Sequence, residues 1–268
     1  MACRNAYRNR IIINSVEETQ HKITEPVVAQ KVSRLFFGVD SKIQADDLLQ
    51  NNIDMFEWVV RNKIPPNFYG RNIVGENALT KKEIDFLHIR GAKIAAIYKD
   101  TGEKKKEEAG VAVAKKAIEA ARKLEIPAET AIFLEIADGE AVTRDFLRGF
   151  AKTLISVGYT PAFKSNTDAK YVFDREFSRG LQTDKEVFNK CLIWAVSPTL
   201  SEYDGMTTTH LIHPDVWRPF APSGVTREQI AVWQYGKNCH PIADDEGRNT
   251  TFNLNLIRNI DVIINKMF

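Results

Sequence analysis

Glu135 is the residue whose type and position most clearly suggest chemistry. It lies in the run Ala131–Asp138 (AIFLEIAD), whose aliphatic side chains alternate as in a buried β-strand. A carboxylate inside such a strand costs free energy unless it is paired or used. Because carboxyl groups in apolar surroundings keep their proton more readily than those in water, Glu135 is a candidate general acid.

Two aspartates could supply a second carboxylate. Asp40 ends the apolar run LFFGVD, and Asp138 follows shortly after Glu135. Glycosidases usually need two carboxyl groups, about 5–5.5 Å apart for retention of configuration or roughly 6.5–9.5 Å for inversion. We therefore expect glycoside hydrolysis with Glu135 as the acid and with Asp40 and Asp138 as alternatives for the base or stabiliser. Water would be the second substrate, and no cofactor is implied.

Other side chains near expected strand ends could line a sugar pocket. Amide and guanidinium groups bond to hydroxyls, and aromatic faces stack on the apolar side of a pyranose. The candidate substrate-binding residues are Arg71, Tyr98, Trp194, Trp233, Gln234 and Asn253.

Short apolar strands alternate with amphipathic helices along most of the chain. This order predicts a parallel α/β fold, and eight strands predict a (β/α)₈ barrel of the TIM type, which typically has about 250 residues. The strands are expected at 35–40, 68–74, 93–98, 131–137, 159–163, 191–196, 230–235 and 251–256. We expect an N-terminal arm or linker at 1–32 and the barrel at 33–268. A doubly wound sheet is the alternative, weakened because no G-x-G-x-x-G follows the first strand.

Each candidate also has a structural interpretation. Glu135 could pair with Arg71 inside the barrel, and Asp40 could cap the following turn. Asp138, which precedes Gly139, could be a turn residue or a helix N-cap. The aromatic candidates could pack in the core, and the amides could satisfy backbone groups.

Several short motifs occur in a common order, and together they resemble those of a known family. They are Phe37–Ser41, Gly70–Ile73, Leu79–Glu83, Ala96–Tyr98, Ala131–Glu135, Gly158–Tyr159 and Trp233–Tyr235. The chain resembles the glycoside-hydrolase-like barrels, a family of unknown function distantly similar to the family 25 lysozymes (muramidases). The resemblance implies a TIM-type barrel, a glycan or cell-wall polysaccharide as the partner with peptidoglycan as the first guess, and an extracellular or cell-envelope location.

The resemblance also implies acids that this chain lacks. The muramidases carry Asp-x-Glu on strand four, where this chain has Glu135-Ile136-Ala137, so Ala137 occupies the position of the catalytic glutamate. Their last strand carries Asp-x-Asn, where this chain has Asn253-Leu254-Asn255. The second hypothesis is therefore a catalytically inactive carbohydrate-binding or interaction module on a hydrolase scaffold.

The composition argues against several other classes. A hydrophobic fraction of 44%, a charged fraction of 27% and a net charge of +2 are ordinary for a globular protein and do not favour nucleic acid. The three cysteines lie far apart, and His210 and His213 lack an evident third ligand, so no metal is expected. No apolar run approaches the roughly 20 residues of a membrane span. Ile11–Ile13 is too short for a signal-peptide core of about 7–15 residues.

Overall fold

The structure is a computed structural model that describes residues 35–49, 52–61, 65–201, 217–239 and 251–268. The predicted arm at 1–32, His210 and His213 lie outside the described residues.

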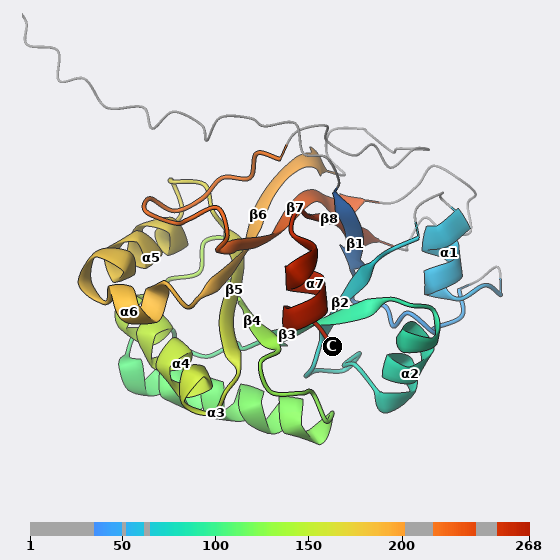
Figure 1. Cartoon of the computed structure of the whole chain (residues 1–268), viewed down its shortest axis with the longest axis horizontal. Coiled ribbons are helices and arrows are strands. Elements are labelled where there is room, and N and C mark those ends of the chain that lie inside the picture. Colours follow the sequence, from blue (N-terminus) through green and yellow to red (C-terminus); the bar gives the residue numbers. More distant parts are fainter. Residues whose placement is uncertain (1–34, 50–51, 62–64, 202–216, 240–250) are drawn as a thin grey trace, which may run out of the picture.

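Eight strands form one closed barrel in chain order, with helices packed around it (Figure 1). The strands are β1 (Phe36–Asp40), β2 (Phe68–Asn72), β3 (Lys93–Lys99), β4 (Ala131–Glu135), β5 (Thr160–Asn166), β6 (Leu192–Ser201), β7 (Ile230–Cys239) and β8 (Phe252–Ile257). The helices are α1 (Met55–Arg61), α2 (Lys81–Ile89), α3 (Glu107–Lys123), α4 (Arg144–Ser156), α5 (Val172–Thr183), α6 (Lys185–Phe188) and α7 (Ile260–Lys266). The closed barrel confirms the predicted fold class and excludes the open doubly wound sheet.

The direction of β8 departs from a fully parallel barrel. Strands β1 to β7 pair in parallel, whereas β8 is antiparallel to both β7 and β1. The register therefore sets Asn253, near the start of β8, opposite Asp40 at the end of β1. Asn255 lies opposite Gly38. The reversal brings both asparagines toward the end of the barrel where the parallel strands finish.

Large aromatic rings fill the interior of the barrel. The Trp194 ring meets Phe133 edge-on, with centroids 5.2 Å apart, and meets Phe68 in the same manner at 6.2 Å. A Cβ atom at Gly38 would lie only 2.2 Å from the Phe68 ring, so a side chain at this position would have to displace it. At Gly70 a Cβ would lie 2.6 Å from the Trp194 ring. The two glycines make room for these rings.

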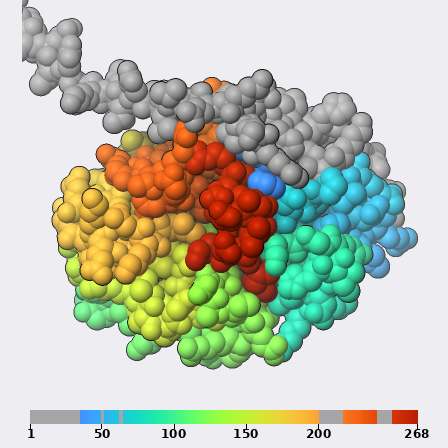
Figure 2. All heavy atoms as spheres, viewed as in Figure 1, coloured from blue at the N-terminus to red at the C-terminus, as the bar shows by residue number. Residues whose placement is uncertain are grey.

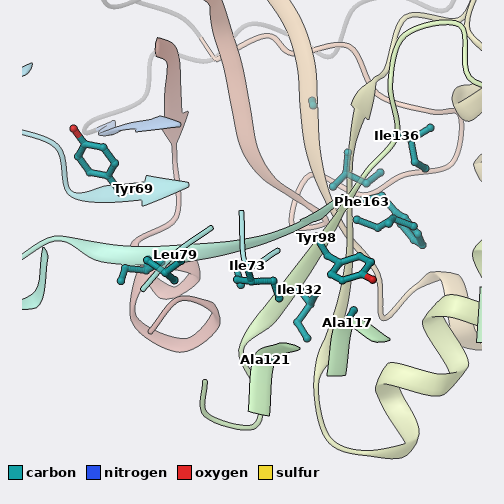
Figure 3. Packing of buried hydrophobic residues seen from close by; sticks show 14 of the residues in the cluster. Tyr69, Ile73, Leu79, Tyr98, Ala117, Ala121, Ile132, Ile136 and Phe163 are labelled. Carbon is teal, nitrogen blue, oxygen red and sulfur yellow. The ribbon is translucent and has the colours of Figure 1, made fainter. Parts of the chain in front are cut away.

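A second hydrophobic cluster lies between the strands and the helices (Figure 3). Tyr98 of β3 and Ile132 of β4 lie in this cluster together with Ala117 and Ala121 of α3. The small alanine side chains allow the helix to approach the sheet closely, so both faces of the barrel strands are buried.

Helix α7 closes one end of the barrel. Its Val262 and Ile263, and Met267 just after it, pack with the interior residues of the strands rather than with the outer cluster. The backbone of Phe268 then pairs with that of Ile94 in both directions, at 2.8 and 3.2 Å. Figure 2 shows α7, in red, between the teal segment around α2 and the yellow-green segments. Any opening into the barrel must therefore lie at the opposite end.

The first helix is shorter than the sequence pattern suggests. Residues 45–62 read as one helix, whereas α1 spans only Met55–Arg61. Before it, Leu48 forms a β-bridge with Asp54, and Asn52 has a φ of 59°. A left-handed residue cannot continue an α-helix, which explains the difference.

Glu83 of α2 forms a buried ion pair with Arg71 of β2. Thr80 caps α2 and accepts a hydrogen bond from the Glu83 backbone at 3.1 Å. The spacing of Thr80 and Glu83 is typical of a capping box, but the Glu83 side chain points to Arg71 instead. Its Oε1 lies 2.7 Å from Arg71 Nε and accepts a hydrogen bond from Ala45 N at 2.7 Å. Burial raises the pKa of Glu83, while Arg71 and the Ala45 N–H oppose that rise.

We predict that Glu83→Gln lowers the free energy of unfolding by about 3–5 kcal/mol, because it leaves the Arg71 charge buried without its counter-ion. Urea unfolding followed by circular dichroism measures this. The matched control is Glu57→Gln, which breaks an exposed pair with Arg61 and should change stability by less than about 1 kcal/mol. Equal effects of the two substitutions would contradict the assignment.

Candidate active site

A polar cavity of about 120 Å³ opens at the end of the barrel opposite α7. It is formed by the last residues of several parallel strands, the loop after β1, and the start of β8. Its lining consists of Asp40, Ser41, Lys42, Gly70, Asn72, Ile97, Lys99, Glu135, Lys164, Asn238, Thr251, Phe252 and Asn253. Barrel enzymes place their working residues at this end.

Asp40 is held at the base of the cavity by three donors. Its Oδ2 accepts hydrogen bonds from Lys164 Nζ at 2.5 Å and from Asn253 Nδ2 at 2.8 Å. Its Oδ1 accepts from Asn255 Nδ2 at 2.8 Å. Asn255 Oδ1 in turn accepts from Trp194 Nε1 at 2.9 Å, which fixes the orientation of the amide. Asp40 and its three donors Lys164, Asn253 and Asn255 form what we call the Asp40 network. Asp40 itself is only 5% exposed.

The Asp40 network defines what Asp40 can do chemically. Charge-assisted hydrogen bonds such as these are roughly twice as strong as neutral ones, and the Lys164 ammonium forms an ion pair with the carboxylate. Lys164 Nζ also lies 4.7 Å from the centroid of the Trp194 ring, whose face attracts a cation. Asp40 can therefore orient neighbouring groups and present a fixed negative charge, and three of its roughly four lone-pair sites are already occupied.

Glu135 is the more accessible carboxylate of the cavity. It is the last residue of β4, and its side chain is 29% exposed. Lys99 Nζ lies 3.8 Å from Glu135 Oε2, which is too long for a hydrogen bond. Within the described part of the chain no hydrogen bond fixes this carboxylate, so it is free to bond to a ligand.

Asp138, the third predicted acid, does not line the cavity. Its Oδ2 accepts a hydrogen bond from Lys237 Nζ at 2.9 Å in an exposed pair. The loop after β4, which carries Asp138, is fixed by the fully buried Lys104, which pairs with Glu140. Glu140 Oε2 accepts from Ala137 N at 3.0 Å. Asp40 and Glu135 thus line the same cavity, whereas Asp138 lies outside its lining.

Three predicted binding residues lie on the outer face of the barrel wall. Tyr98 and Trp233 belong to the cluster beneath the helices, and Trp233 Nε1 donates to Ser197 O at 3.0 Å. Arg71 is fully buried, pairs with Glu83, and donates to Ser41 O at 2.5 Å and Asn77 O at 2.8 Å. The suggested pairing of Arg71 with Glu135 is therefore wrong.

Alternation along each strand explains this placement. In β2, Gly70 and Asn72 line the cavity, so Arg71 between them points the other way. In β3, Ile97 and Lys99 line it, so Tyr98 points outward.

The remaining predicted binding residues lie on the inner side. Asn253 lines the cavity and bonds to Asp40. Trp194 is fully buried beneath the Asp40 network and supports it through Asn255. Gln234, opposite Asn255 in the register, is 2% exposed, and its Oε1 has no hydrogen-bond partner among the described residues.

Lys164, Lys99 and Asn72 line the cavity but were not among the predicted site residues. Lys164 was missed because the fifth strand was expected to end at Phe163, whereas β5 continues to Asn166. Continuing the alternation two residues from Ala162 places Lys164 on the inner face. The same step of two residues from Ile97 places Lys99 on the inner face.

This barrel and its polar mouth define a glycoside hydrolase-like domain. Residues 66–247, more than half of the chain, match the family model described as "Rv2525c-like, glycoside hydrolase-like domain", and the protein belongs to that family. The match confirms the resemblance drawn from the sequence motifs. No curated protein matches the chain.

Solved structures share the fold at low sequence identity. An uncharacterized B. stearothermophilus protein has a TM-score of 0.70 at 23% identity, over 87% of this chain and 100% of that chain. A family 25 glycosyl hydrolase from Bacillus anthracis has a TM-score of 0.50 at 13% identity, over 95% and 100%. The catalytic domain of endolysin ply40, from bacteriophage P40 of Listeria monocytogenes, has 0.50 at 12%, over 87% and 97%. At these identities the similarity shows the barrel fold alone.

Among the described residues, no helix is long and apolar enough to cross a bilayer.

We predict that Lys164→Met lowers the free energy of unfolding by about 3–5 kcal/mol, because Asp40 then keeps a buried charge without a cation. Asp40→Asn combined with Lys164→Met should recover part of that loss, since no charge remains unpaired. A double-mutant cycle by urea unfolding measures the coupling. Strictly additive effects would mean that the two groups do not form an ion pair.

Proposed function

We propose that this domain binds a glycan at the mouth of the barrel and hydrolyses a glycosidic bond, with Glu135 as the proton donor. One observation carries the proposal. Among the described residues that line the cavity, Asp40 and Glu135 are the two carboxylates. The cavity lies at the end of the barrel where barrel enzymes place their catalytic groups. The two acids come from different strands, β1 and β4, so the fold positions them independently.

The two carboxylates would have different roles. Glu135 gives its proton to the glycosidic oxygen as the bond from the anomeric carbon to that oxygen breaks. Positive charge then develops on the sugar, and the fixed negative charge of Asp40 stabilises it without reorganisation. Water adds to the anomeric carbon and returns a proton to Glu135. Asp138 is less favoured as the second carboxylate because it pairs with Lys237 outside the cavity lining.

Peptidoglycan is the first substrate to test. The family description supports a glycan. Asn72, Asn238 and Asn253 bring amide groups to the cavity, and amides both donate to and accept from sugar hydroxyl and acetamido groups. An extracellular or cell-envelope location is part of the same proposal.

A second candidate function is glycan binding without hydrolysis. It is favoured by the Asp40 network, in which both carboxylate oxygens already accept hydrogen bonds. It is favoured also by Ala137, which stands where the resemblance to muramidases implies an acid. In this alternative Glu135 accepts hydrogen bonds from sugar hydroxyls and no bond is broken.

We predict that Glu135→Gln reduces the release of reducing ends from purified peptidoglycan by at least about 100-fold, because the amide cannot supply the proton. The matched control is Glu129→Gln. Glu129 is exposed and lies just before the opposite end of β4, so its substitution should leave the rate unchanged.

The outcomes separate the two functions. Equal release by wild type and Glu135→Gln would show that Glu135 is not the acid. Absence of release by the wild type, together with cosedimentation with peptidoglycan that Glu135→Gln weakens, would identify a binding module. Neither release nor binding would reject peptidoglycan as the ligand.

A further inference from the structure

We propose that the cavity contains a subsite for an anionic substituent of the glycan, formed by Lys99 with Lys42 beside it. This inference rests on the proposed glycan binding and specifies which glycans bind. The substituent is a carboxylate or a phosphate on a sugar unit next to Glu135.

The charges of the cavity lining support such a subsite. The lining contains the three lysines Lys42, Lys99 and Lys164 but only the two carboxylates Asp40 and Glu135, which leaves one positive charge in excess. Lys164 is committed to Asp40 at 2.5 Å and is buried. The positive charges of Lys42 and Lys99 therefore remain, and the carboxylate of Glu135 can balance only one of them.

Lys99 has the geometry of a group that is available to a ligand. It is the last residue of β3 and shares the inner face with Ala95 and Ile97, whose side chains pack in the interior cluster. Its side chain is 51% exposed, and Glu135 Oε2 is 3.8 Å from Nζ. Since that distance exceeds a hydrogen bond, the ammonium donors of Lys99 are free to bind an anion.

Lys42 adds a second charge on the β1 side of the cavity. It is exposed and forms no ion pair within the part of the chain that the structure describes. The excess of lysines over carboxylates in the lining gives the cavity a net positive charge, which attracts an anion. Neutral sugars need only the amides and carboxylates of the lining. Lys42, which has no ion pair among the described residues, and Lys99, whose pair with Glu135 is 3.8 Å long, therefore distinguish anionic from neutral glycans.

The test compares two oligosaccharides that differ in their charged groups. One is a tetrasaccharide of alternating N-acetylglucosamine and N-acetylmuramic acid with free lactyl carboxylates, and the other is chitotetraose. Calorimetry on the full chain should show about tenfold tighter binding of the anionic ligand, the size expected for one charge-assisted hydrogen bond. The preference should shrink at high salt, which screens exposed charges.

Variants of Lys99 assign the preference to the subsite. Lys99→Gln should weaken binding of the anionic tetrasaccharide about tenfold and leave chitotetraose within about twofold, because only one ligand loses a charged partner. Lys99→Arg should restore the preference. The matched control is Lys93→Gln, which removes an exposed lysine from the other end of the same strand and should change neither ligand.

A third ligand, chitotetraose carrying a 6-phosphate, separates the two anionic groups. Tighter binding of either anionic ligand supports the subsite, and the stronger of the two identifies the group. Equal binding of all three ligands would overturn the subsite while leaving glycan binding intact. Binding of none of them would overturn both this inference and the proposed glycan binding.

Discussion

The ion pair between Asp40 and Lys164 is the interaction that organises the mouth of the barrel. It joins β1 to β5 across the interior, and the amides of Asn253 and Asn255 add β8. A buried charge must be paired and fully hydrogen-bonded to be tolerated. Three donors bond to the carboxylate, and Gly70 leaves room for the Asp40 side chain. A Cβ added at Gly70 would lie only 2.7 Å from the Asp40 Cβ.

The reversed direction of β8 makes this arrangement possible. Residues from the start of a parallel eighth strand would lie at the closed end, far from Asp40. Because β8 is antiparallel to β1, Asn253 and Asn255 reach the mouth, and the chain leaves β8 at the closed end. There α7 follows directly and covers the interior cluster. One change of strand direction thus supplies both the donors at the mouth and the closure of the other end.

The sequence predicted the barrel because alternating strands and helices carry strong periodic signals, and strand ends then placed Asp40, Glu135 and Asn253 at one mouth. The family followed from short motifs in a common order. It did not predict the direction of β8, which no local pattern encodes. Arg71 is predicted in the pocket because it lies near the end of the second strand, and the sequence FYGRN has no alternation of polar and apolar residues that would distinguish the two faces of β2. Its partner Glu83 has the capping-box spacing from Thr80, and local sequence does not reveal a distant counter-ion.

The same hydrogen bonds that stabilise Asp40 limit its chemistry, and this limit determines which steps the other groups of the cavity must carry out. A carboxylate that accepts from an ammonium and two amides provides a fixed charge and has little freedom to accept a proton. Proton transfer must then depend on Glu135, whose one ion pair among the described residues is with Lys99 at 3.8 Å. Since Lys99 is too distant to form a hydrogen bond with Glu135, a ligand group that lies beside both can accept a hydrogen bond from the ammonium and also contact the carboxyl group.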